Sequence, residues 1–266
     1  MLSDTALARD TASSIAARLA PGMIFRWMYP LNWCRVRRSR AAVEDAVSLA
    51  SAVSLNIETP GAENLAKLSS KKDYLRDIID PIRHISQLTA RGSRFERVKQ
   101  TTQFIVGPAG ESDSEIVKYM WGLYDRLRLH RIYFSAYQKG LGDASLPAEQ
   151  SGAGAATDLF VREHRLYQVD FLMRKYGFRD TDIAFDERGH LSLESDPKEI
   201  WAANHPEFFP VDVNRGTRLA LLRVPGLGPV AVQRLLQLRR TQRIGRLDEI
   251  GTMNARLRKA QLYLAF

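Results

Sequence analysis

The sequence predicts an α/β fold in which a partial barrel of parallel strand–helix units precedes a small, basic, all-α domain. Apolar stretches that alternate like strands are separated by stretches with helical periodicity, which is the order of parallel βαβ units. Positive charge collects near the other end, since residues 211–266 hold eleven Arg and Lys and only three acids, or +8 of the total +9. We expect an unassigned segment 1–35, a partial barrel 36–138, a linker with a helical extension 139–210, and the basic domain 211–266.

The elements of the first part follow from their apolar patterns. Strands are expected at 23–28, 53–58, 101–107 and 132–136, and helices at 41–50, 73–88 and from Ser112 or Asp113 to about Arg128. The turn signals Pro60-Gly61 and Gly107-Pro108 end two of the strands, and Pro81 predicts a kink or break in its helix. Three or four strands are too few to close a barrel.

The composition of the linker is less regular. The Gly-, Ala- and Ser-rich stretch 139–156 predicts a loop, 157–176 a long amphipathic helix, and 197–204 a short helix before the basic domain.

Composition also restricts location and chemistry. No apolar run is long enough to span a membrane, and the charged residues among the first twenty interrupt any signal-peptide core, so we expect a cytoplasmic protein without a membrane partner. Cys34 is the only cysteine, which excludes an internal disulfide and a cluster held by cysteines of this chain alone. His130 and His164 have no second ligand at metal-binding spacing, so we assign no metal site and no catalytic residue.

A tight turn stands out in the basic domain, Val224-Pro225-Gly226-Leu227-Gly228-Pro229, flanked by two helical patterns. Its glycines permit backbone conformations and close approaches that side chains would block, and Pro229 suits the first turn of a helix. Free N–H groups at such a helix start bind anions. The pattern resembles the helix-hairpin-helix family, in the version found in competence-type DNA receptors.

This resemblance implies binding to the DNA phosphate backbone without sequence readout, because phosphate contacts position a protein but do not specify bases. The residues expected to bind DNA are Gly226, Leu227, Gly228, Val230, Arg234, Arg239 and Arg240. The chain departs from the family at Val230 and Ala231, where a lysine is frequent, and at 250–253, which resembles a second hairpin without its second glycine. We expect that second hairpin to pack rather than bind. Two alternatives stay open: a turn that only joins packed helices, and a basic face that is only solvated.

Several stretches further upstream resemble a second family. They are 53–60 (Val-Ser-Leu-Asn-Ile-Glu-Thr-Pro), 102–107 (Thr-Gln-Phe-Ile-Val-Gly) with 110–113, then 131–137, 162–168 and 208–214. The first two are similar to the later strands of a radical S-adenosylmethionine (SAM) barrel. The whole set resembles the radical SAM proteins of DNA modification and repair, over about residues 36–266. The resemblance implies a partial radical-SAM-type barrel followed by an all-α helix-hairpin-helix domain.

The family binds S-adenosylmethionine at a [4Fe–4S] cluster held by Cys-x3-Cys-x2-Cys, whereas this chain has Cys34 alone. The chain therefore looks like the C-terminal portion of such a protein, and we expect neither cofactor on this chain by itself. The resemblance names Asn56 and Glu58, at a strand end, as a residual cofactor site; alternatively they only cap that strand.

Three functions stay open. In the first, the chain is a DNA-binding relative of the repair enzymes. In the second, it is a radical SAM component whose cluster comes from a partner chain that supplies the missing half barrel. In the third, it is an adaptor that recruits a partner through open sheet edges.

Overall fold

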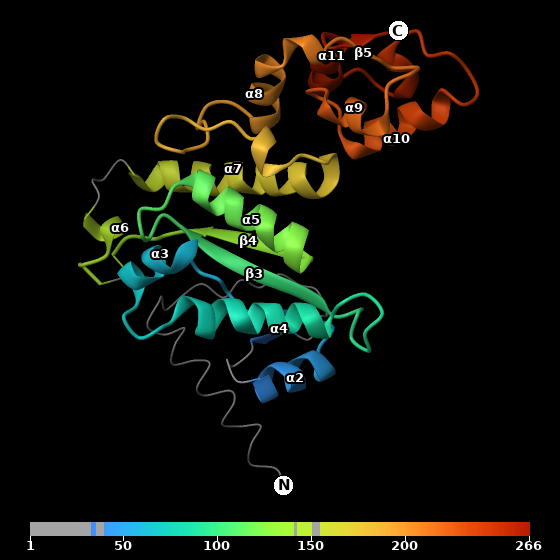
Figure 1. The fold of residues 1–266 in the computed structure, drawn as a ribbon. Helices are drawn as coiled ribbons and strands as arrows, with labels where there is room; N and C mark the ends of the chain where they lie inside the picture. Colours follow the sequence, from blue (N-terminus) through green and yellow to red (C-terminus); the bar gives the residue numbers. More distant parts are fainter. Residues whose placement is uncertain (1–32, 36–39, 141–142, 151–154) are drawn as a thin grey trace. The chain divides into compact units, whose positions relative to one another are not determined.

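The computed structural model describes residues 33–35, 40–140, 143–150 and 155–266, and the expected strand 23–28 lies outside them. The chain divides into two compact units (Figure 1). The first comprises Met1–Glu111 and Leu127–Phe160, and the second comprises Ser112–Arg126 and Val161–Phe266. No helix among the described residues is long and apolar enough to cross a membrane.

The first unit is built on a parallel sheet. Its strands are β1 (Trp33–Arg35), β2 (Ala52–Ser54), β3 (Lys99–Val106) and β4 (Arg131–Ala136). They lie in the order β1-β2-β3-β4, so each strand is hydrogen-bonded to the next along the chain. The longest ladder joins β3 to β4, from Thr101 opposite Arg131 to Val106 opposite Ala136. The predicted α/β class with parallel strands is confirmed, and within the described part of the chain the sheet is open and closes no barrel.

Helices of the first unit connect and cover these strands. They are α2 (Arg40–Leu49), α3 (Gly61–Leu68), the π-helical turn η1 (Leu75–Ile79), α4 (Asp80–Leu88) and α6 (Pro147–Gln150). α2 contacts α4 (Figure 1). The Gln100 side chain of β3 donates to the Ile82 carbonyl of α4 at 2.8 Å, so α4 packs against β3. Pro81 follows the π-helical turn η1, and Ile79 and Asp80 before it both keep αR backbone, with the Asp80 amide donating to the Leu75 carbonyl. The chain therefore passes Pro81 as a continuous helix with a π-helical turn, and the expected break does not occur. α6 lies within the stretch expected to be a loop.

The second strand is shorter than the expected 53–58 because a side chain enters its ladder. The Thr102 hydroxyl donates to the Leu55 carbonyl at 2.8 Å and accepts from the Ile57 amide at 2.9 Å. Regular pairing therefore stops after Ser54 and resumes as a single bridge between Glu58 and Phe104. Alternation of side chains cannot reveal such a break, because the side chains still alternate around it.

The second unit is mainly helical. Its elements are α5 (Asp113–Leu127), α7 (Ala155–Tyr176), η2 (Asp180–Asp182), α8 (Pro197–Asn204), η3 (Pro206–Phe208), β5 (Val211–Asp212), α9 (Arg218–Arg223), α10 (Pro229–Leu238), η4 (Leu247–Ile250), α11 (Ala255–Gln261) and β6 (Leu264–Ala265); α5 and α7 each have one end in the first unit. β5 and β6 pair in parallel, Val211 with Leu264 and Asp212 with Ala265. The expectation that residues 211–266 are all-α is therefore wrong in this respect. Strands of two residues are too short to carry an alternating pattern.

An aromatic cluster holds α8 and α9 together. The Trp201 ring lies 5.5 Å from that of Phe178 and 5.2 Å from that of Phe208. The Arg223 guanidinium lies 4.4 Å from the ring centres of both Phe178 and Trp201, and it pairs with Asp182 at 3.0 Å. The Arg223 guanidinium is therefore used in contacts with these rings and with Asp182, although Arg223 counts toward the net charge of the basic segment.

Candidate nucleic-acid interface

The turn between α9 and α10 leaves the start of α10 without a cap. α9 begins at Thr217, whose hydroxyl accepts from the Ala220 amide at 3.1 Å, and the turn closes with the Leu227 amide donating to the Val224 carbonyl at 3.1 Å. Gly228 stands at the N-cap of α10 in an extended conformation and has no side chain that could accept a hydrogen bond. The first amides of a helix have no intrahelical acceptor. This helix start can therefore donate to an external anion.

Gly226 allows the turn to lie against α11. Its φ is +85°, and a Cβ atom there would come within 2.1 Å of the Arg256 carbonyl oxygen and 3.0 Å of the Ala260 amide nitrogen. Only glycine tolerates both the backbone conformation and this close approach. Gly226 thus brings the backbone of α11, which carries Arg256, to the turn.

The other turn residues expected to bind DNA divide between core and surface. Leu227 is 2% exposed, and its carbonyl accepts from the Lys198 ammonium group at 2.7 Å. Gly228 is half-buried near the Tyr176 hydroxyl, and Val230 is 66% exposed. Gly228 and Val230, unlike Leu227, therefore leave the start of α10 accessible from outside the protein.

The three arginines expected to bind DNA differ in what holds them. Arg239 donates to the Gly216 carbonyl at 2.7 Å, so it stabilises the loop before α9. The exposed Arg234 makes a weak contact with the Ile250 carbonyl at 3.4 Å. Among the described residues, the exposed Arg240 side chain makes no ion pair or hydrogen bond.

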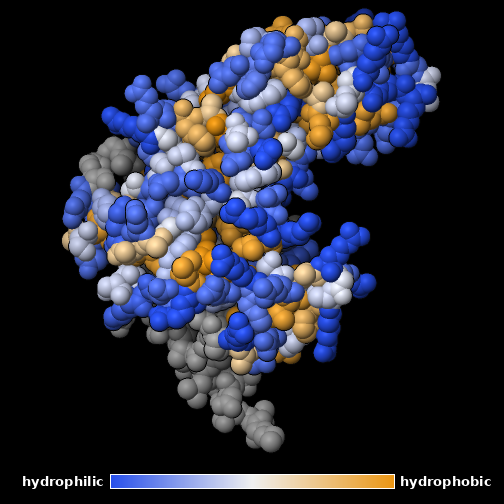
Figure 2. Space-filling model, in the orientation of Figure 1, coloured by the Kyte–Doolittle hydropathy of each residue, from blue (hydrophilic) through white to orange (hydrophobic). Residues whose placement is uncertain are grey.

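Other arginines of the basic segment also have free side chains among the described residues. Exposed arginine side chains of residues 211–266 without an ion pair or hydrogen bond to described residues are Arg215, Arg218, Arg240, Arg256 and Arg258. They come from α9, α11 and the segments before α9 and after α10, and Figure 2 shows blue hydrophilic side chains interspersed with orange hydrophobic ones on the visible face of this segment. Other cations are paired, as Arg246 is with Asp248 at 2.6 Å and Lys259 with Glu199 at 2.5 Å.

Lys198 and Tyr176 reach the turn from outside the basic segment. Lys198 is 7% exposed, and its ammonium group lies 4.6 Å from the centre of the Tyr176 ring. Burial lowers the pKa of Lys198 to about 7, against the opposing effect of the Asp196 carboxylate. Sequence reasoning missed both residues, because they lie about 30 and 50 positions before the turn and no motif links them to it.

The second turn of the basic segment has a different helix start. Asn254 caps α11, and its side chain accepts from the Leu257 amide at 3.0 Å. Gly251 precedes it at φ +147°. The chain itself therefore fills the position that an anion would occupy at this helix.

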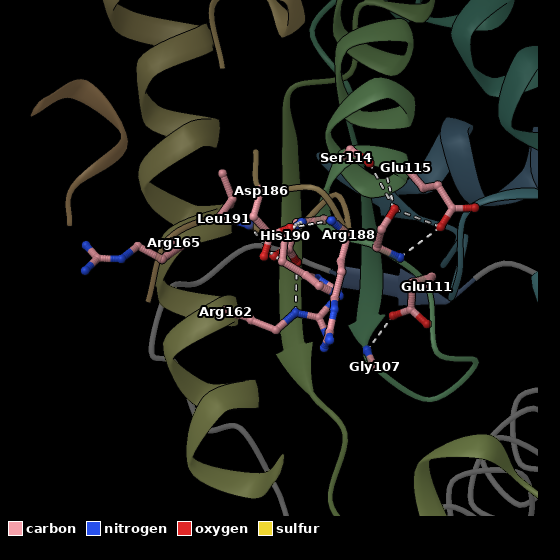
Figure 3. Close-up of polar contacts among 12 residues, drawn as sticks. Gly107, Glu111, Ser114, Glu115, Arg162, Arg165, Asp186, Arg188, His190 and Leu191 are labelled. Atoms are coloured by element: carbon pink, nitrogen blue, oxygen red, sulfur yellow. Dashed lines mark hydrogen bonds and ion pairs between the residues drawn. The ribbon is translucent and has the colours of Figure 1, made fainter. Parts of the chain in front are cut away.

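The expected cofactor residues lie at the carboxyl end of β2. Glu58 has φ +66° and bridges to β3, and Asn56 precedes it and is partly exposed. In the loop after β3, the buried Glu111 carboxylate accepts from the Gly107 amide and, at 3.1 Å, from the Ala109 amide (Figure 3).

With Cys34 as its only cysteine, the chain does not supply the thiolate ligands of a [4Fe–4S] cluster. Among the described residues, no group of three or more His, Cys, Asp and Glu could hold a metal ion.

A second polar cluster surrounds Asp113 in the second unit. Asp113 is fully buried and accepts from the Arg162 side chain at 3.0 Å and the Leu191 amide at 2.9 Å, with His190 at 3.4 Å. Asp186 accepts from the His190 amide at 2.8 Å and holds the loop that contains His190 and Leu191 (Figure 3). Asp113 therefore ties the loop to α5 and α7, and the turn before α10 remains the stronger candidate site.

No family model, no curated protein and no solved structure matches this chain.

Proposed function

We propose that this protein binds DNA through the turn before α10 and the arginines around it, without sequence preference. The observation that carries the proposal is the uncapped start of α10, which lies in a segment with a net charge of +8. Backbone amides at a helix start and exposed guanidinium groups are both donors suited to phosphate oxygens. The arrangement supports the reading of this turn as a helix-hairpin-helix.

The distribution of charge favours a polyanion over a single small anion. Free arginines lie on α9 and α11 and in the segments before α9 and after α10, whereas one phosphate would need only a few donors. Neutralising several phosphates releases counterions, and binding then weakens steeply as salt concentration rises. Amides and arginines that contact phosphates do not distinguish bases, which supports binding without sequence preference.

Fluorescence anisotropy with two labelled duplexes of unrelated sequence tests the proposal. We expect equal affinities for the two duplexes, and a steep linear fall of log K with log salt concentration. Affinity that does not depend on salt, or a footprint confined to one sequence, would contradict it. Phosphate ions at matched ionic strength serve as a control for binding of a small anion.

The resemblance to radical SAM proteins of DNA modification and repair leads to a second proposal. It is that the sheet of the first unit corresponds to later strands of their barrel, with Asn56 and Glu58 at a residual S-adenosylmethionine site. Four parallel strands adjacent in chain order support this correspondence. The single cysteine favours DNA binding, and not radical chemistry, as the activity of this chain.

Anaerobic reconstitution with iron and sulfide separates these readings. We expect no stable brown chromophore on this chain alone, because three thiolates are required and one is present. A stable [4Fe–4S] spectrum on the isolated chain would contradict this. A spectrum that forms only with a partner chain would favour the alternative of an enzyme component completed by that partner.

A further inference from the structure

We propose that Lys198 is the positioning residue of the phosphate-binding turn, fixing the peptide group between Leu227 and Gly228 so that its N–H faces the ligand. The inference rests on the proposed DNA binding. It assigns a role to a buried cation that lies outside the basic segment and is not a phosphate ligand itself.

The geometry of one peptide group carries the argument. The Leu227 carbonyl and the Gly228 N–H belong to the same planar unit, and this peptide bond is trans. The two groups therefore point in opposite directions. Lys198 donates to the carbonyl at 2.7 Å from the protein interior, so the Gly228 N–H is directed away from Lys198. That N–H belongs to the N-cap residue of α10, where no side chain accepts from the first turn.

The charge on Lys198 adds a second effect. A hydrogen bond from an ammonium group is stronger than one from a neutral donor, and it polarises the peptide group that accepts it. The N–H at the other end then becomes a better donor to a phosphate oxygen. A neutral residue at position 198 could fill the same space but would lack this effect.

The groups around Lys198 explain why a bound phosphate would change its protonation state. Tyr176 from α7 lies under its ammonium group, and Asp196 at the start of α8 is the carboxylate that acts on it. Arg256 from α11 is close enough to Tyr176 to oppose the effect of burial on the tyrosine pKa. Burial leaves the pKa of Lys198 at about 7, so its protonation changes near neutral pH. A phosphate bound at Gly228 favours the protonated form, and DNA affinity should therefore fall as pH rises from 6 to 9.

The experiment compares Lys198→Met, Lys198→Arg and the control Lys118→Met, an exposed lysine on α5. Anisotropy titrations with a mixed-sequence duplex are run at constant ionic strength from pH 6 to 9. We expect Lys198→Met to bind roughly tenfold more weakly than wild type at pH 6 and to lose the pH dependence. Lys198→Arg, which stays charged, should bind with little change across the range, and Lys118→Met should follow the wild-type profile.

Glycine-selective NMR on the wild-type protein keeps the inference testable if a variant fails to fold. We expect the Gly228 amide resonance to shift with a midpoint near pH 7, while the Gly251 amide serves as an internal reference. Wild-type affinity and an unchanged pH profile in folded Lys198→Met would overturn the role of Lys198 and leave the proposed function intact. A Gly228 resonance that does not respond to pH would also overturn it. Absence of DNA binding by the wild-type protein would instead overturn the proposed function.

Discussion

Two turns of the basic segment each lead into a helix, and they differ at the residue that begins it. Gly228 begins α10 and offers no side chain to the first amides, whereas Asn254 begins α11 and accepts from the Leu257 amide. The first turn also contains Gly226, against which the backbone of α11 packs. The second turn supplies that packing helix. The amides at the start of α10 are therefore left open to a ligand, whereas Asn254 caps the amides at the start of α11. α11 in turn packs against Gly226 in the first turn.

Replacing the glycine of each turn should give the largest difference. Gly226→Ala places a Cβ 2.1 Å from a backbone oxygen at φ +85°, so we expect a loss of about 3 kcal/mol in the free energy of unfolding. Gly251→Ala meets only the flexible end of Arg234 at 3.4 Å, so its cost is the backbone strain of roughly 1–2 kcal/mol. Urea denaturation measures both, and equal losses would contradict the difference between the two turns.

The buried lysine that supports the first turn should make stability depend on pH. Its pKa is about 7 in the folded state and near the usual 10.5 in the unfolded chain, so the unfolded state binds more protons between these values. Below pH 7 the folded protein carries the full cost of burying the protonated Lys198 side chain. This cost falls as pH rises, because the folded-state lysine becomes neutral above its pKa. We expect the contribution of this group to increase the free energy of unfolding by about 2 kcal/mol between pH 7 and 9.

The increase is measured as the difference between wild type and Lys198→Met in denaturation series across that range. Lys118→Met should reproduce the wild-type series. Parallel curves for wild type and Lys198→Met would show that this lysine titrates normally.

Removing the cap of the second helix should affect folding and spare binding. Asn254→Ala leaves the Leu257 amide without its acceptor, and we expect a loss of about 1 kcal/mol in unfolding free energy. DNA affinity should stay at the wild-type value under conditions in which the variant is folded. A large loss of affinity would mean that the second helix start also contacts DNA.

The smallest expected effects concern single arginines. Arg240→Gln removes an exposed cation without a partner among the described residues and should reduce the slope of log K against log salt by about 1. Arg246→Gln removes a cation already paired with Asp248, so its slope should change less. Slopes reduced equally would show that the observed pairing does not limit contact with DNA.

The sequence was informative where local chemistry determines structure. Alternating apolar residues predicted the strands at 101–107 and 132–136, and Pro229 after Gly228 predicted the start of α10. These signals are local, because a strand face or a helix start depends on residues a few positions apart.

Contacts between distant segments could not be predicted in this way. Lys198 and Tyr176 reach the turn only after α7 and α8 pack against it, and Arg239 turns back to a loop carbonyl instead of facing solvent. The pairing of β5 with β6 joins residues about 50 positions apart through ladders of two residues. Burial and partners decide the role of each of these residues, and neither is visible in a single sequence.

The open start of α10 is the central claim, and one matched pair of variants tests it most directly. Gly228→Asp fits without a clash, since the nearest atom to its Cβ is the Tyr176 hydroxyl at 3.6 Å, and its carboxylate would cap the first amides and repel phosphate. Asn254→Asp adds the same charge at the start of α11, which is already capped. In DNA titrations at fixed salt, we predict a loss of roughly tenfold or more for Gly228→Asp and about threefold or less for Asn254→Asp. Equal affinities for the two folded variants would contradict phosphate binding at α10.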